Sequence, residues 1–153
     1  KNARINIGSQ IETVARASSI PILICSEVYK EPTSYMVAFD ASKTAIKAVS
    51  LLAKSELLKG LPGHIVMIGH NNDEAKESLV AAAKLLKQAG FEVDTHHLPE
   101  TDAVNGLLTF QTQNNIDVIV IGAYGRSKWQ QLFLGSTTTE IIASTVSPVI
   151  LVR

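Results

Sequence analysis

The chain has 153 residues, of which 46% are apolar, so it can bury one sizeable hydrophobic core but hardly two. Its 14 basic and 14 acidic residues cancel and form no run of like charge, which excludes a nucleic-acid footprint and a polybasic membrane patch. No apolar segment approaches the roughly 20 residues of a membrane span, so we expect one α/β domain without nucleic acid or membrane as a partner.

Cys25 is the single cysteine, which excludes an intrachain disulfide. No segment carries signal-peptide flanks, and we expect a reducing, cytoplasmic setting. Cys25 ends the apolar run Ile20–Cys25, where we expect a small buried thiol rather than a reactive one.

The first 25 residues resemble the last 25 at an offset of 127 positions. Glycine, serine and proline recur at this offset, and the apolar residues between them match in kind. The identities pair Lys1 with Lys128, Gly8 with Gly135, Ser9 with Ser136 and Pro21 with Pro148. We interpret residues 1–25 as the last helix and strand of a preceding copy of the same domain, with chance similarity of two helix–proline–strand units as the alternative.

Residues 26–33 are polar and form the expected linker, and residues 34–153 form the expected complete domain. This domain contains five apolar runs of strand length. They are Ser34–Asp40, His64–Gly69, Phe91–Leu98, Val118–Gly122 and Pro148–Val152. The third run alternates apolar and polar residues, which suits an edge strand.

Four segments with helical spacing of apolar residues lie between these strands. They run from Ala41 to Leu58, from about Asn72 to Gly90, from Asp102 to Asn114 and from Ser136 to Val146. Ser42 is the expected N-cap of the first, and Asn71, Asn72 or Asp73 that of the second. Because strands and helices alternate over short connections, we expect an open parallel sheet of five strands with right-handed crossovers.

In such sheets ligands bind beyond the carboxyl ends of the strands, where the strand order reverses. If the strand order is 3-2-1-4-5, the tip Ala38-Phe39-Asp40 lies beside the tip Ile121-Gly122. Asp40 can accept a hydrogen bond from a ribose hydroxyl. Glycine at positions 122 and 125 lets backbone amides approach a ligand without a Cβ in the way.

The last expected helix opens at Gly135, Ser136 and Thr137, where free N–H groups and the helix dipole favour an anion. Arg126 and Lys128 add positive charge in the preceding loop, although they could equally be solvated. Each residue alone is an ordinary turn or cap residue. The spacing Gly-x2-Gly-x9-Gly-Ser, on a strand, loop and helix, is more specific.

With these motifs the chain resembles the universal stress protein family. The resemblance covers Met36–Val152 and rests on VAFDAS, on the glycine spacing that starts at Gly122, and on the closing Ser-Pro-Val-Ile-Leu-Val. It implies a flavodoxin-like or Rossmann-like open five-stranded sheet with strand order 3-2-1-4-5 and helices on both faces, and it implies ATP as the ligand, with or without Mg²⁺. It also implies a homodimer or a sister domain joined through Pro148–Val152. We expect Pro21–Cys25 to pair with this edge, because both segments are apolar.

The family's binding pattern, carried over by position, implies a set of nucleotide contacts in this chain. Ribose and adenine contacts fall on Asp40 with its neighbours Ala38 and Phe39, adenine contacts on Ile68 and Gly69, and phosphate contacts on Gly122, Gly125, Gly135 and Ser136. Ile121, Tyr124, Arg126 and Thr137 complete the candidate site. Two departures from the family stand in it: Tyr124 replaces a histidine, and Ala38-Phe39 replaces a proline-containing tip. Tyr124 or Phe39 could crowd the pocket.

The sequence contains neither a Walker motif nor a Gly-x-Ser-x-Gly elbow, so it does not demand catalysis. His96 and His97 are adjacent on a strand and point to opposite faces, which disfavours a shared metal. We expect an ATP-binding regulatory module of the stress response. The alternatives are a structural or dimerisation module without nucleotide and a slow Mg-dependent ATP hydrolase.

Overall fold

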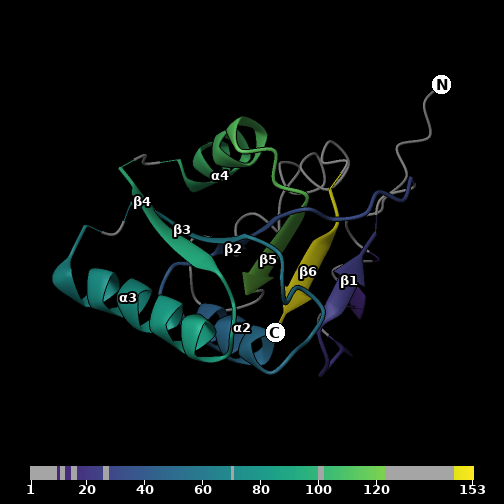
Figure 1. The fold of residues 1–153 in the computed structure, drawn as a ribbon, viewed down its shortest axis with the longest axis horizontal. Helices are drawn as coiled ribbons and strands as arrows, with labels where there is room; N and C mark the ends of the chain where they lie inside the picture. Colours follow the sequence, from purple (N-terminus) through teal and green to yellow (C-terminus); the bar gives the residue numbers. More distant parts are fainter. Residues whose placement is uncertain are drawn as a thin grey trace.

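The computed structural model describes residues 10, 13–14, 17–25, 28–69, 71–99, 102–122 and 147–153. Within these residues, six strands form one sheet (Figure 1). The strands are β1 Ile22–Ile24, β2 Tyr35–Ala38, β3 Gly63–Ile68, β4 Val93–Leu98, β5 Val118–Gly122 and β6 Val149–Val152. The helices are α2 Lys43–Ala53, α3 Asp73–Gln88 and α4 Ala103–Gln113.

The strand order is β1-β6-β5-β2-β3-β4. Its last five members reproduce the expected order 3-2-1-4-5, and all four pairings among them are parallel. The expectation of a five-stranded, wholly parallel sheet is wrong in one respect, because β1 adds a sixth strand antiparallel to β6. Without β1, β6 would be an apolar edge with unpaired backbone groups, and such an edge readily pairs with another strand.

The expected pairing of the segment around β1 with β6 is confirmed, with Ile22, Leu23 and Ile24 opposite Leu151, Ile150 and Val149. The expectation of a buried Cys25 is wrong, since this residue is exposed. Its position explains the exposure: β1 has a neighbouring strand on one side only, and Cys25 follows its last residue.

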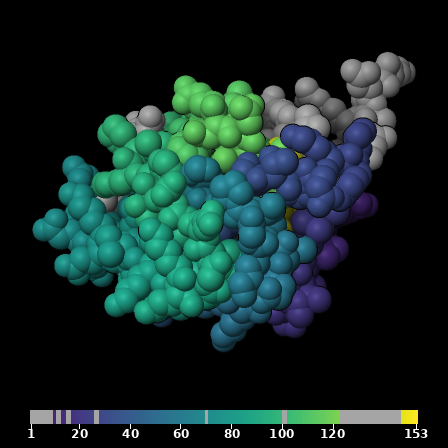
Figure 2. Space-filling view, viewed as in Figure 1, coloured from purple at the N-terminus to yellow at the C-terminus, as the bar shows by residue number. Residues whose placement is uncertain are grey.

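Each face of the sheet has its own hydrophobic core. α2 and α3 cover one face and α4 covers the other (Figure 1). We call the core under α2 and α3 the first core and the core under α4 the second core. Alternate residues of each strand point to opposite faces, so Val37 of β2 belongs to the first core and Met36 to the second. β2 is buried along its whole length, as a central parallel strand must be. Only small parts of β6 show between its neighbours in the space-filling view (Figure 2).

Each described helix begins where a side chain caps it. The Ser42 hydroxyl accepts a bond from the Ala45 N–H (3.2 Å), and the Asn72 side chain accepts one from the Ala75 N–H (2.8 Å). Asp102 accepts bonds from the second and third N–H groups of α4. These bonds satisfy backbone donors that have no partner inside the helix. No helix in the described part of the chain is long and apolar enough to cross a membrane.

α2 is shorter than the segment Ala41–Leu58 predicted from its apolar spacing. It ends at Ala53, where the Lys54 N–H bonds the Leu51 carbonyl and tightens the last turn. The next residues form turns, and Leu58 packs back into the first core with 3% of its surface exposed. The apolar spacing therefore continues beyond Ala53 because Leu58 is buried, although it lies in a turn and not in the helix.

Asp117 holds the linker against the start of β5. Its Oδ1 lies 2.5 Å from the Lys30 ammonium, and its Oδ2 accepts bonds from the Thr33 N–H (2.8 Å) and hydroxyl (2.6 Å). Hydrogen bonds from Lys30 and Thr33 hold the pKa of Asp117 at about 2, below its ordinary 3.8. The contact fixes the path by which the chain leaves β1 and enters β2 beside β5.

We expect Asp117→Asn to lower the free energy of unfolding near neutral pH and to flatten its decline in acid. Because the folded pKa is depressed, the carboxylate stabilises the fold above its ordinary value of 3.8, and this stabilisation is lost as the pH falls through about 2. Urea unfolding across this range measures the effect. Glu92→Gln, which removes an exposed carboxylate, is the control. If the free energy of unfolding of Asp117→Asn fell with decreasing pH as steeply as that of the wild type, the stabilising role of the Asp117 carboxylate would be contradicted.

Candidate functional site

The carboxyl ends of β2 and β5 lie side by side in the middle of the sheet. Ala38 of β2 is in register with Ile121 of β5 on one side and with Val66 of β3 on the other. From β2 the chain proceeds through β3 and β4 to one edge, whereas β5 leads to β6 on the opposite side. The strand order therefore reverses between β2 and β5, which is where open α/β sheets bind ligands.

Asp40 lies just beyond the end of β2 and is almost completely buried, with 7% of its surface exposed. Its Oδ1 accepts a bond from the Ser42 N–H at 3.0 Å. Its Oδ2 is buried and has no hydrogen-bond partner in the described part of the chain. A buried carboxylate oxygen without a donor is costly, so this atom is suited to accept a hydrogen bond from a ligand hydroxyl.

The turn between β2 and α2 fixes the position of this carboxylate. Ala41 adopts a φ of 59°, a left-handed conformation that costs a non-glycine residue energy. Ser42 follows it and performs two tasks: its N–H binds Asp40 and its hydroxyl caps α2. The sequence predicted the second task only. The Asp-x-Ser spacing could have revealed the first, because aspartate commonly bonds the N–H two residues on.

Gly122 brings the tip of β5 against the first turn of α2. A Cβ at this position would lie 2.5 Å from the carbonyl carbon of Thr44 and 2.6 Å from the backbone nitrogen of Ala45. These atoms are backbone and cannot move aside as a flexible side chain can. Glycine therefore has a packing role here, which the sequence did not indicate, and its role towards phosphate stays a prediction.

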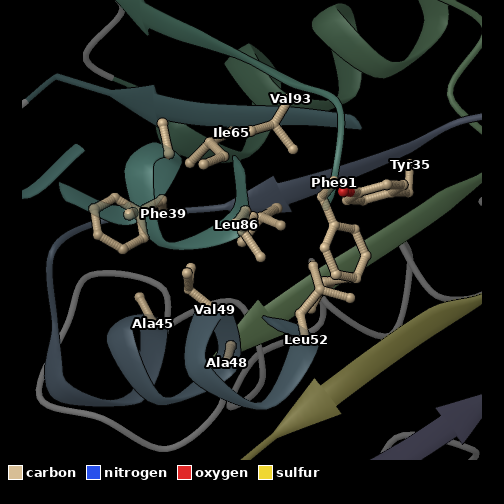
Figure 3. Close-up of a cluster of buried hydrophobic side chains, with 14 of the residues drawn as sticks. Tyr35, Phe39, Ala45, Ala48, Val49, Leu52, Ile65, Leu86, Phe91 and Val93 are labelled. Carbon is tan, nitrogen blue, oxygen red and sulfur yellow. The ribbon is translucent and has the colours of Figure 1, made fainter. Parts of the chain in front are cut away.

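Phe39 does not line the crevice with its side chain. The ring is fully buried in the first core, near Ala45, Val49 and Leu86 (Figure 3). It borders an apolar cavity of about 180 Å³ between α2 and α3. Phe39 can therefore reach a ligand at the switch point only through its backbone, and its ring does not obstruct that position.

Ile68 and Gly69 end the neighbouring strand β3. Ile68 is 3% exposed and packs under α4, where a Cβ at Gly106 would lie 3.0 Å from its Cδ1. Gly69 has a φ of 68°, and its carbonyl accepts a hydrogen bond from Nε2 of His97. Both residues lie at the carboxyl edge of the sheet, one strand away from Asp40.

The structure brings part of the predicted site together. Ala38, Phe39 and Asp40 meet Ile121 and Gly122 at adjacent strand ends. The remaining candidates lie outside the described residues: they are Tyr124, Gly125, Arg126, Gly135, Ser136 and Thr137. The expected helix 136–146 lies outside them as well. Among the residues that the structure describes, no group of three or more His, Cys, Asp or Glu side chains could hold a metal ion.

An open, mostly parallel sheet with helices on both faces and a carboxylate at the switch point defines a flavodoxin-like α/β protein. Within that class, residues 62–153 match the model of the universal stress protein family. The chain is also 33% identical, over 100% of its length and 54% of the relative's, to universal stress protein Slr1230 of Synechocystis sp.. The chain therefore belongs to the universal stress protein family.

Solved structures of this family share the fold. A universal stress protein from Archaeoglobus fulgidus DSM 4304 matches with a TM-score of 0.66 and 24% identity, over 92% of this chain and 52% of that one. A universal stress protein in complex with cAMP matches with a TM-score of 0.62 and 17% identity, over 81% and 98%. One from Archaeoglobus fulgidus in complex with dAMP matches with a TM-score of 0.57 and 22% identity, over 80% and 98%. The chain spans about half the length of the curated relatives it matches.

We expect Gly122→Ala to destabilise the fold by about 1–3 kcal/mol, the usual cost of overpacking, because the new methyl group meets the backbone of α2. Gly106→Ala is the matched control. Its methyl group would meet Cδ1, Cγ2 and Cγ1 of Ile68 at 3.0, 3.3 and 3.4 Å, which belong to a side chain rather than to backbone, and alanine favours the helix, so it should destabilise the fold less than Gly122→Ala does. Thermal and urea unfolding without ligand measure both variants. Equal stability of Gly122→Ala and wild type would contradict the packing role.

Proposed function

We propose that this chain binds an adenine nucleotide at the switch point, that the ligand is ATP with or without Mg²⁺, and that occupancy of the site regulates a cytoplasmic stress-response role. The observation that carries the proposal is the buried Oδ2 of Asp40, which has no donor in the described part of the chain. Two proteins of the same fold are described as complexes with cAMP and dAMP, which are both adenine nucleotides.

The proposed roles follow from the chemistry of each position. Asp40 accepts hydrogen bonds from the ribose hydroxyls, and the end of β3 at Ile68 and Gly69 contacts adenine. The phosphates bind backbone N–H groups at Gly122 and Gly125 and at the helix start Gly135–Thr137. Mg²⁺, when bound, would neutralise phosphate charge. No residue is assigned a catalytic role, and the function is one of binding.

The first test is calorimetric titration of the wild type and of Asp40→Asn with ATP. Asparagine can still accept the Ser42 N–H, but its second atom donates where the carboxylate oxygen accepts. A lost hydrogen bond to a charged group costs about 1.5–3 kcal/mol, so we expect affinity to fall roughly 10- to 100-fold.

Asp73→Asn is the matched control, because it removes an exposed aspartate at the start of α3. We expect it to bind ATP as the wild type does. No heat with the wild type would contradict the proposal and favour a structural module without nucleotide. Steady Mg-dependent release of ADP would instead indicate the slow hydrolase. Gly122 is unsuited to this test because its substitution perturbs α2 directly.

We further propose that residues 1–25 are the last helix and strand of a preceding unit, that residues 26–33 are the linker, and that residues 34–153 form the complete unit. The register of β1 on β6 supports this. At the repeat offset Ile22 corresponds to Val149, yet it faces Leu151, and Ile24 faces Val149. If the two repeat segments exchange places, each residue keeps an equivalent partner. This is the property of a two-fold axis that passes between Leu23 and Ile150.

This symmetry implies that the β6 edge accepts either a sister unit or a second copy of the chain. We expect the double variant Ile22→Asp, Ile24→Asp to release β1, because both side chains pack against the second core. The exposed β6 edge should then shift sedimentation towards a dimer. Leu23→Asp is the control, since Leu23 is 50% exposed on the other face. Unchanged sedimentation with β6 amides still protected would contradict the proposal.

A further inference from the structure

Two histidines from neighbouring strands bind each other beneath α4. Nδ1 of His64 on β3 lies 3.0 Å from Nε2 of His96 on β4. Both residues are partly buried. Phe110 of α4 packs on the pair, with its ring centroid 5.6 Å from that of His64 and 4.7 Å from that of His96. Sequence reasoning missed this pair, because the two positions become neighbours only through the strand pairing.

Phe110 is one of the two large apolar side chains of α4 that are buried against the sheet. The helix packs mainly on β3, and its buried large apolar residues are Leu107 and Phe110. Gly106, one turn before Phe110, lies against Ile68 at the carboxyl end of β3. The packing of Phe110 on the histidine pair thus affects how closely α4 covers the carboxyl end of β3.

The hydrogen bond between the histidines depends on their protonation. Two facing nitrogens need one proton between them, so a pair of neutral rings or a singly charged pair can keep the bond. When both rings are charged, both nitrogens are donors and repel at this distance. Burial, and next the neighbouring His64, lower the pKa of His96 below its ordinary 6.5, while Asp94 acts in the opposite direction.

Asp94 is the ionisable group that faces the pair from β4, in register with His64. On the other side of His64, β2 contributes Met36, which is apolar. α4 contains no ionisable residue, and its N-cap Asp102 lies about two turns from Phe110. Asp94 offsets only part of the effect, since the pKa of His96 remains lowered.

We propose that His64, His96 and Phe110 form a pH-sensitive latch that holds α4 on the sheet at neutral pH and releases it in mild acid. The face of Phe110 tolerates one imidazolium through a cation–π contact. A second charge has no acceptor within the pair and gains hydration when Phe110 moves away. Release of α4 then loosens the contact between Gly106 and Ile68.

The direction of the pH effect follows from linkage. Because the pKa of His96 is lower in the folded state than its ordinary 6.5, the docked helix has its full stability above that value. The stability is lost as the pH falls through the lowered folded value. The latch is therefore closed in neutral solution and opens on the acid side of 6.5.

Amide hydrogen exchange of the full chain between about pH 5 and about pH 7.5, corrected for intrinsic rates, tests the latch. We expect protection in α4 to be lost on the acid side, while protection in α3 holds. His96→Gln keeps a hydrogen-bonding group without titration and should make α4 protection independent of pH. His97→Gln, which removes the histidine on the opposite face, should retain the wild-type response.

The latch is refuted if α4 protection in the wild type changes with pH no more than α3 protection does, or if His96→Gln responds as the wild type does. Should His96→Gln fail to fold, side-chain NMR titration of the wild type decides. The side-chain signals of His96 and the amides of α4 must then change at a common midpoint below 6.5. A response of α4 at a different midpoint overturns the proposal.

Discussion

The contact on which the site depends is the approach of β5 to the first turn of α2. At Gly122 the two backbones leave no room for a Cβ, and this closeness keeps the ends of β2 and β5 together where the strand order reverses. The same turn holds Asp40 through the N–H of Ser42 and leaves Oδ2 without a donor in the described part of the chain. Packing that stabilises the fold thus also creates a buried acceptor at the ligand position.

The sequence predicted what depends on local pattern. Alternation of strands and helices predicted the five parallel strands, the family resemblance implied their order, and cap residues such as Ser42 and Asn72 marked where helices begin. Features that depend on tertiary contact escaped it: the packing reason for Gly122, the pairing of His64 with His96, and the turn that ends α2 early. Of the candidate site, the structure places the positions at the ends of β2, β3 and β5, and nucleotide contact stays a prediction at every candidate residue.

Two further features lie outside the switch point. β1 covers the apolar edge of β6 in an antiparallel register that matches the internal repeat. On the sheet face that α4 covers, Phe110 packs on a pair of histidines, and the hydrogen bond between them requires that at least one ring be neutral. The first feature lies at the edge of the sheet, away from Asp40. The second acts through α4 on Ile68, which belongs to the proposed nucleotide site.

The most direct measurement of the central claim is an amide chemical-shift map of the wild type titrated with ATP. Binding at the switch point predicts saturable shifts at Asp40, Ile68 and Gly122, which come from three different strand ends, and little change along β1. The adenine and ribose contacts predict that AMP causes similar shifts at Asp40 and Ile68. Absence of shifts, or shifts confined to residues away from the carboxyl ends of β2, β3 and β5, would contradict the account.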